Sequence, residues 1–402
     1  MQDLEAVKLQ LRSLALLRGL LCDEVFSAFL SLAPADAPEA SRAESVARFC
    51  SALFAVTDDL ADYVRIKMLE DENVVVRRAA EGTLKESYRE ALRAELAALQ
   101  AFAGVTPEDA AAYTNAPLPF PRWQNSAPDL GEIYRDQLMN IGKRGYGVWA
   151  KYRMFVLKDG QISPVKHPDE QRLSDFSGYR RERSLVIANT EALLAGKPCN
   201  NVLLYGDAGA GKSSTVKAIV NEYWTEGLRL IEVKKNELFF LPDILDRLAR
   251  NPLKFIIFID DLSFTRSDSD FGALKAILEG SVAGRSRNIA VYATSNRRHL
   301  VQESISDRSG DDLHRQDTIQ ELTSLSARFG LQVTFLKPDK KLFAQIVLAL
   351  ARQHGVTLAK DELLRKAEAF ALRGGGRSPR LAKQFIEYIA YSEKNAGASE
   401  NI

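Results

Sequence analysis

The sequence predicts an α/β protein in which a parallel sheet is preceded by a mostly helical N-terminal domain and followed by a C-terminal helical lid. Three observations support this prediction. From residue 201 onward, short apolar runs alternate with helical segments, as in sheets that are buried on both faces. Beyond Pro338 only helical patterns remain, and residues 1–115 also show helical spacing. A chain of 402 residues has room for about two to three ordinary domains.

Residues 1–115 are expected to form the helical N-terminal domain. Apolar residues recur at helical spacing between Leu11 and Val25, and Ser41 with Glu44 suggests a capping box. A further helix is predicted over residues 80–101. No set of catalytic side chains stands out. An interaction or regulatory domain and a pure scaffold are equally compatible with this pattern.

Residues 116–172 are expected to form a linker and a β-hairpin. The stretch 115–128 is rich in proline and has no clear period. Residues 134–152 interleave basic and aromatic residues, which suits single-stranded nucleic acid but is explained better by long side chains lying along a helix surface. Asp159-Gly160 between the apolar runs 152–157 and 161–165 predicts a hairpin turn.

Residues 173–337 are predicted to form the α/β domain, and residues 338–402 the lid. A helix over residues 180–194 is expected to precede the first strand. The predicted strands are 202–205, 228–233, 255–259, 289–294 and 331–335. The predicted helices are 213–224, 242–249 and 271–279 in the sheet domain, and 340–353, 360–372 and 379–393 in the lid.

Composition and charge exclude several classes of protein. A net charge of +1 gives no global attraction to nucleic acid or to a membrane, although a local patch remains compatible with it. The three cysteines are far apart and lack C-x-x-C spacing, which disfavours a disulfide framework or zinc site and indicates a reducing cytoplasm. Asp3 and Glu5 do not fit a signal peptide, and charges interrupt the apolar segment 14–32, so no membrane partner is expected.

The most specific motif is a glycine-rich loop of the form G-x-x-x-x-G-K-S between strand 202–205 and a helix. It comprises Gly206, Asp207, Ala208, Gly209, Ala210, Gly211, Lys212 and Ser213, with Ser214 following. Glycines let backbone N–H groups approach a polyphosphate, and the helix start adds its dipole. Lys212 is expected to reach the β- and γ-phosphates, and Ser213 to ligate Mg²⁺. This loop, the P-loop below, therefore predicts binding of ATP or ADP.

Two other strands end in polar side chains that should lie beside the P-loop. Strand 255–259 leads into Asp260 and Asp261, and strand 289–294 leads into Asn296. Ligands of such sheets bind beyond the carboxyl ends of the strands. Asp260 is expected to hold Mg²⁺ through its water shell, and Asp261 to orient or deprotonate the attacking water. Asn296 is expected to hydrogen-bond the γ-phosphate or the water. The structural alternatives are an edge salt bridge and a turn.

Four further residues are candidates for the same site. Gly178 and Tyr179 suit an adenine pocket, or else a simple linker turn. Arg328 precedes the last strand and should project to the domain edge, where it can act as an arginine finger in a neighbouring subunit or be a surface residue. Arg380, at the start of the last helix, is expected to point back to the γ-phosphate, with Arg377 as its rival.

In this order, the motifs resemble those of an AAA+ ATPase over residues 173–391. The stretches 201–214, 260–264, 278–280 and 292–300 more closely resemble a bacterial AAA+ family of unknown function. The resemblance implies ATP binding by a Walker A loop, Mg²⁺, a sheet of strand order 5-1-4-3-2 and a C-terminal helical lid. It implies no particular substrate.

Three features depart from the usual AAA+ pattern. Asp261 stands where glutamate is usual, and its shorter side chain predicts slow activation of water. Ala327 stands where an acidic residue is more usual beside the arginine finger. Residues 236–241 lack the aromatic-apolar-glycine loop of peptide-threading machines, so Phe239 and Phe240 are expected in the core.

Two main functions are compatible with these features. The first is a Mg²⁺-dependent ATPase that works as a homo-oligomer, a hexamer being one option, through Arg328, and that remodels an unidentified protein partner. The second is a slow-turnover module in which ATP sets the oligomeric state or partner affinity. A DNA-associated loader is a third, weakly supported possibility that rests on Arg285, Arg287, Arg297 and Arg298. Residues 304–320 are predicted to be a mobile insertion.

Overall fold

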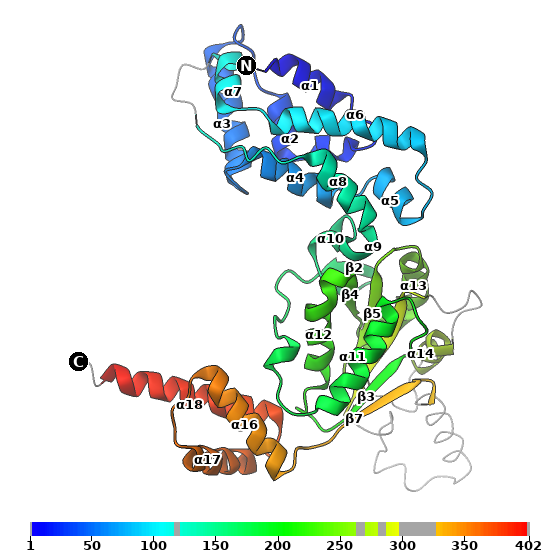
Figure 1. The fold of residues 1–402 in the computed structure, drawn as a ribbon, viewed down its shortest axis with the longest axis vertical. Coiled ribbons are helices and arrows are strands. Elements are labelled where there is room, and N and C mark those ends of the chain that lie inside the picture. The colour runs from blue at the N-terminus through cyan, green and yellow to red at the C-terminus, as the bar shows by residue number, and fades with distance from the viewer. Residues whose placement is uncertain (1, 116–120, 263–269, 280–286, 297–326, 400–402) are drawn as a thin grey trace. The chain divides into compact units, whose positions relative to one another are not determined.

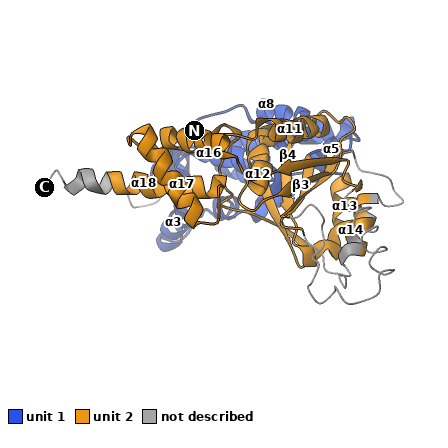
Figure 2. Ribbon diagram, turned by 90° about the horizontal axis from the view of Figure 1, so that it is seen from below, with its two compact units in different colours: residues 1–151, 250–253 blue, residues 152–249, 254–402 orange. Residues whose placement is uncertain are grey.

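The computed structural model of the chain describes residues 2–115, 121–262, 270–279, 287–296 and 327–399 (Figure 1). Two compact units are present (Figure 2). Unit 1 consists of residues 1–151 and 250–253, and unit 2 of residues 152–249 and 254–402. Each unit has its own cluster of buried apolar side chains, as expected of domains that fold around separate cores.

Unit 1 is built from helices. They are α1 (Leu4–Arg12), α2 (Glu24–Leu30), α3 (Glu39–Phe54), α4 (Leu60–Glu70), α5 (Val74–Ala80), α6 (Glu86–Ala103), α7 (Pro107–Thr114), α8 (Leu130–Met139), α9 (Ile141–Arg144) and α10 (Val148–Lys151), with the 3₁₀ helix η1 (Arg18–Cys22). Aromatic rings fill its centre, where the ring centroids of Phe26 and Phe29 lie 4.9 and 4.5 Å from that of Phe102. Such pairs contribute large buried apolar areas.

Three details of unit 1 differ from the sequence predictions. The helix predicted over residues 80–101 begins at Glu86, because α5 ends at Ala80 and Gly82 turns the chain at φ +67°. Helix α3 begins after Pro38, so Ser41 is not its cap. Tyr134, the first residue of the segment 134–152 that was interpreted as a helix surface, is buried, and its hydroxyl accepts a hydrogen bond of 3.0 Å from the Asn73 amide.

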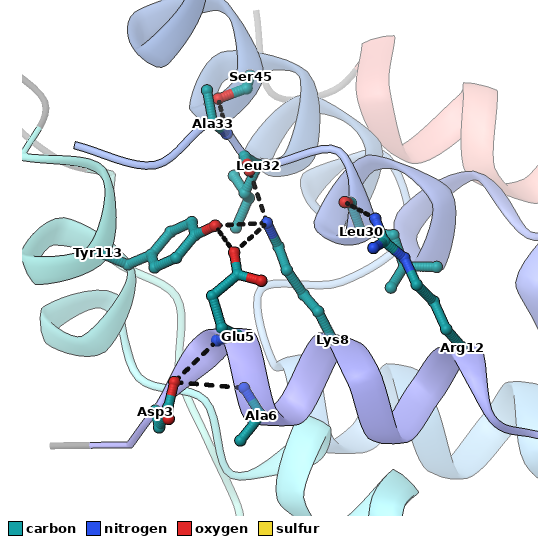
Figure 3. Close-up of polar contacts among 10 residues, drawn as sticks. All are labelled: Asp3, Glu5, Ala6, Lys8, Arg12, Leu30, Leu32, Ala33, Ser45 and Tyr113. Atoms are coloured by element: carbon teal, nitrogen blue, oxygen red, sulfur yellow. Dashed lines mark hydrogen bonds and ion pairs between the residues drawn. The ribbon is translucent and has the colours of Figure 1, made fainter. Parts of the chain in front are cut away.

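A polar cluster ties α1 to α7 and to the residue that follows α2 by two positions (Figure 3). The buried ammonium of Lys8 donates hydrogen bonds to the Leu32 carbonyl oxygen at 2.6 Å and to the Tyr113 hydroxyl at 2.9 Å. The Tyr113 hydroxyl in turn donates to Glu5. Burial lowers the pKa of Lys8 and raises the pKa of Tyr113. A buried charge is tolerated when it is paired in this way.

The described strands of unit 2 form one seven-stranded sheet. They are β1 (Met154–Lys158), β2 (Gln161–Pro164), β3 (Val202–Gly206), β4 (Leu228–Glu232), β5 (Lys254–Ile259), β6 (Ile289–Ser295) and β7 (Leu331–Phe335). Their order is β2-β1-β4-β5-β6-β3-β7, and every pair except β1–β2 is parallel. The five strands from β3 to β7 therefore have the order 5-1-4-3-2, which confirms the predicted sheet.

The predicted hairpin is present, and it extends this sheet. Asp159 and Gly160 have φ values of +50° and +70°, as a two-residue hairpin turn requires. Strand β1 then pairs in parallel with β4, with Met154 opposite Leu230.

Helices cover both faces of the sheet. In unit 2 the described helices are η2 (Leu173–Asp175), α11 (Arg180–Leu194), α12 (Lys212–Tyr223), η3 (Trp224–Glu226), η4 (Lys235–Phe240), α13 (Leu241–Ala249), α14 (Asp270–Glu279), α16 (Lys340–His354), α17 (Lys360–Arg373) and α18 (Pro379–Ser399). Helices α11 and α12 lie on one face, and α13 and α14 on the other (Figures 1 and 2). This is the arrangement that right-handed crossovers produce when the strand order reverses after β4. Helices α16, α17 and α18 form the predicted lid.

The prediction that Phe239 and Phe240 lie in the core was wrong. Phe239 is 78% exposed and Phe240 is 37% exposed, whereas Leu238 is fully buried. The short 3₁₀ helix η4 can direct only part of its surface toward the sheet, and Leu238 takes that position. The Phe240 ring instead rests against Gly160 of the hairpin turn. Within the described part of the chain, no helix has the length and apolar character needed to cross a membrane.

Candidate functional site

The P-loop runs from the end of β3 to the start of α12, and its first glycine is enforced by close packing. Gly206 has φ +133°, and a Cβ atom there would lie 2.1 Å from the Phe335 carbonyl oxygen of β7. The next residue, Asp207, donates its N–H to that same oxygen at 3.0 Å and accepts the Lys337 N–H at 2.8 Å. The P-loop is therefore anchored to the end of β7 and to the start of the segment that leads to the lid.

Lys212 lies at the first position of α12 and is held within the loop. Its side chain is buried, and its ammonium donates to the carbonyl oxygens of Gly206 and Asp207 at 2.8 and 2.9 Å and to Asn296 Oδ1 at 2.9 Å. Burial lowers the pKa of Lys212, while the carboxylates of Asp207, Asp261 and Asp260 oppose that shift. Because an ammonium has three donors, a phosphate oxygen would have to replace one of these contacts.

The structure brings the two predicted magnesium ligands together. The Ser213 hydroxyl donates to Asp260 Oδ1 at 2.6 Å. A hydroxyl and a carboxylate are hard oxygen donors that suit Mg²⁺, which takes one or two protein ligands and completes its shell with water and phosphate. Among the described residues, no group of three or more His, Cys, Asp or Glu side chains could hold a metal alone. The pair therefore fits a magnesium ion that arrives with a nucleotide.

Asp261 and Asn296 complete a continuous set of contacts around the loop. Asn296 donates its amide N–H to Asp261 Oδ1 at 2.8 Å and accepts from Lys212 through Oδ1. Asp261 has φ +53°, a conformation that is uncommon for residues other than glycine. Lys212, Ser213, Asp260, Asp261 and Asn296, all predicted from the sequence, thus gather at the carboxyl edge of β3, β5 and β6.

The lid touches the same loop through the start of α18. The Arg380 N–H donates to the Gly209 carbonyl oxygen at 3.3 Å, and the charge of Arg380 is near enough to Lys212 to contribute to its lowered pKa. Arg377, the rival candidate, is engaged elsewhere, because its Nε donates to Glu368 of α17 at 2.8 Å.

Gly178 and Tyr179 lie where the sheet meets the lid. Both have positive φ, and Gly178 packs against Leu342 of α16. The Tyr179 ring lies 5.4 Å from the ring of Phe335, its hydroxyl donates to the Leu336 carbonyl oxygen at 2.6 Å, and burial raises its pKa to about 12. The pair therefore connects α11 to the lid and to the end of β7.

Arg328 does not lie with the predicted site residues around the P-loop. It is half-buried and precedes β7, so it lies at the edge of the sheet opposite to Phe335 and the P-loop. Of the four arginines proposed for DNA, Arg285, Arg297 and Arg298 fall outside the described residues, as does the segment 304–320.

Sequence reasoning missed Thr294, a buried residue of β6 that bonds to both acidic residues. Its hydroxyl donates to Asp260 Oδ1 at 2.6 Å and accepts the Asp261 N–H at 2.9 Å. The available signal was a threonine near the end of a buried strand, two residues before Asn296. A buried hydroxyl must find partners, and these are the two residues that follow the neighbouring strand β5.

The strand order and the side chains at its carboxyl edge define an AAA+ P-loop fold with a helical lid. A family model described as "Protein of unknown function (DUF815)" matches residues 149–393. The chain belongs to this family.

More distant likenesses cover only parts of the chain. The replication factor C large subunit of Staphylothermus marinus is 32% identical over 117 residues, which are 27% of each chain. That of Sulfolobus acidocaldarius is 33% identical over 95 residues, or 22% of each. The chain thus spans about a quarter of these curated relatives. A Thermotoga maritima RuvB structure, titled a Holliday junction branch migration motor, has 18% identity and a TM-score of 0.37, covering 54% of this chain and 63% of RuvB.

Proposed function

We propose that unit 2 binds ATP with Mg²⁺ and hydrolyses it. The observation that supports this most is the hydrogen-bonded set formed by Lys212, Ser213, Asp260, Asp261 and Asn296 around a glycine loop at the start of a helix. Strand ends and a helix N-terminus that converge in this way suit a triphosphate.

Each residue has a distinct role in the proposed reaction. Residues 206–214 cradle the phosphates through backbone N–H groups, and Lys212 exchanges a contact within the loop for a phosphate oxygen. Ser213 and Asp260 hold Mg²⁺, which supplies neutralisation of the phosphate charge. Asp261 and Asn296 orient the attacking water. Gly178 and Tyr179 line the adenine side of the site.

Two arginines complete the proposal. Arg380 contacts the γ-phosphate from the same subunit, because α18 begins against the P-loop while Arg377 is paired with Glu368. Arg328 serves the site of a neighbouring subunit in a homo-oligomer, since its place before β7 is far from its own P-loop. Hydrolysis would move the lid and remodel a protein partner of unidentified kind.

A second candidate function is an ATP-gated module with slow turnover. Asp261 is shorter than the usual glutamate. Thr294 binds its left-handed backbone, and Asn296 binds its carboxylate. A DNA-associated loader is a weaker alternative, favoured by the partial likeness to replication factor C. DNA binding whose affinity falls steeply with salt, measured by fluorescence anisotropy, would support it.

The test is phosphate release by the purified full chain with MgATP, alongside Lys212→Ala as the blank and light scattering with and without nucleotide. Release above the blank supports the ATPase. Tight ATP binding without release, followed by a large gain in Asp261→Glu, supports the gated module. The absence of both binding and release would overturn the proposal.

A further inference from the structure

Thr294 contacts three consecutive residues of the chain that leaves β5. The regular pairing of β5 with β6 ends at Ile259 opposite Ala293. One residue further along, the Thr294 hydroxyl reaches Asp260 and Asp261, and the Thr294 carbonyl oxygen accepts the Leu262 N–H at 2.7 Å. Thr294 of β6 therefore continues to bind the chain that follows β5 after the regular strand pairing has ended.

These hydrogen bonds of Thr294 lie where the backbone turns sharply. Asp261 adopts φ +53°, a left-handed conformation that is unfavourable for a residue with a Cβ atom. The Asp261 N–H that this turn redirects is bound by the Thr294 hydroxyl. The same hydroxyl donates its only hydrogen to Asp260 Oδ1. Among the described residues, the other oxygen of this carboxylate, Oδ2, accepts no hydrogen bond. One oxygen of Asp260 is thus fixed by the protein, while the other has no donor in the part of the chain that the structure describes.

We propose that Thr294 is a positioning residue of the magnesium–nucleotide site, and this inference rests on the proposed function. Its hydroxyl links the Asp260 carboxylate to the Asp261 backbone. Asp260, which would hold the metal, and Asp261, which would orient the water, are thereby kept at a fixed position relative to each other. Thr294 is only 2% exposed, so its side chain is shielded from solvent. Thr294 therefore acts indirectly: it positions Asp260 for Mg²⁺ and Asp261 for the attacking water.

The chemistry of the hydroxyl suggests a discriminating set of variants. Valine keeps the shape of threonine but can neither donate to Asp260 nor accept from Asp261. Serine keeps both functions. Thr190 offers a matched control, because it is also fully buried and its hydroxyl bonds to Tyr292, on the same sheet but away from the P-loop.

The experiment measures the affinity of the full chain for a fluorescent ADP analogue, first in EDTA and then with increasing Mg²⁺. The gain in affinity caused by Mg²⁺ is the readout. Thr294→Val is expected to reduce this gain by about tenfold or more, as loss of a hydrogen bond to a charged group predicts, with the affinity in EDTA unchanged. Thr294→Ser and Thr190→Val should keep the wild-type gain. Where Thr294→Val does not fold, Thr294→Ala must show the same loss.

The outcomes separate this inference from the proposed function. A wild-type chain whose nucleotide affinity does not depend on Mg²⁺ would overturn both. A wild-type chain with a clear Mg²⁺ gain that Thr294→Val and Thr294→Ala retain would overturn the role of Thr294 alone. A loss that Thr190→Val reproduces would show a general effect on the sheet and would equally reject the proposal.

Discussion

Gly206 shows at the scale of one residue why the P-loop can lie against β7. Its missing Cβ would overlap the Phe335 carbonyl oxygen at 2.1 Å, and Phe335 is bonded to the loop at Asp207. Gly206→Ala should therefore separate β3 from β7 and lower the free energy of unfolding by about 2 kcal/mol or more. Urea denaturation measures the loss. Gly211→Ala is the matched control, because Gly211 also has positive φ but open space around it, and an equal loss there would contradict this explanation.

Lys8 makes the stability of unit 1 depend on pH. Its pKa in the folded protein lies below the ordinary value of 10.5, mainly because the ammonium is buried. Between those two pKa values the unfolded chain binds more protons than the folded one, so the contribution of Lys8 to the free energy of unfolding rises with pH across that window. Below the lowered pKa the contribution is constant. Wild type should therefore gain stability relative to Lys8→Met as the pH rises from neutral toward 10.5.

The measurement is urea denaturation followed by the fluorescence of Trp123, which lies in the core of unit 1. Trp149 and Trp224 are replaced by Phe in every variant. Lys85→Met, at an exposed position of the same unit, controls for the loss of one charge. A relative stability that stays flat or falls with pH would reject this assignment.

At the scale of elements, α12 carries Lys212 at one end and Asn221 near the other. Asn221 is buried, accepts from Arg153 Nε at 2.7 Å and donates to the carbonyl oxygens of Asp169 and Gln171 at 2.7 and 2.9 Å. The helix that starts at the P-loop therefore also fixes the segment between β2 and α11.

Asn221→Ala should release this segment, because the carbonyl oxygens of Asp169 and Gln171 lose their donor. We expect a loss of about 1–3 kcal/mol in the free energy of unfolding and faster hydrogen exchange over residues 166–172, measured by mass spectrometry. Asn221→Asp keeps the acceptor for Arg153 but not the donors, so it separates the two contacts. Unchanged exchange in both variants would contradict the anchoring role.

The sequence patterns predicted best the strands of the sheet, which are buried on both faces. Each strand from β3 to β7 lies within one residue of its expected bounds, since a run of apolar residues is needed wherever both faces are covered. The P-loop and the acidic strand end were predictable for a similar reason, because ligand chemistry dictates residue type and spacing. The burial of Phe239 was predicted wrongly, because a 3₁₀ helix buries few of its residues. The contacts of Thr294 were not predicted, because its partners follow a different strand.

At the scale of the whole molecule, the proposed function places one of its residues, Arg328, away from the P-loop of its own chain. The residues that gather at the P-loop include Arg380 from the lid but not Arg328, which lies at the opposite edge of β7. If Arg328 acts on a neighbour, the unit of catalysis is the interface between two copies of unit 2. Heterologous contacts of this kind close into rings where the rotation between copies closes, and otherwise form open filaments.

Mixing two inactive variants tests this arrangement. Lys212→Ala removes a phosphate contact but keeps the arginine, and Arg328→Ala does the reverse, so each alone should show little phosphate release. In an equimolar mixture, about a quarter of randomly formed interfaces would pair an intact P-loop with an intact Arg328, which should restore a corresponding share of wild-type turnover. The double variant Lys212→Ala/Arg328→Ala, mixed with wild type at matched total concentration, controls for subunit exchange. A mixture with no more activity than the separate variants, under conditions where exchange is demonstrated, would mean that Arg328 does not act across an interface.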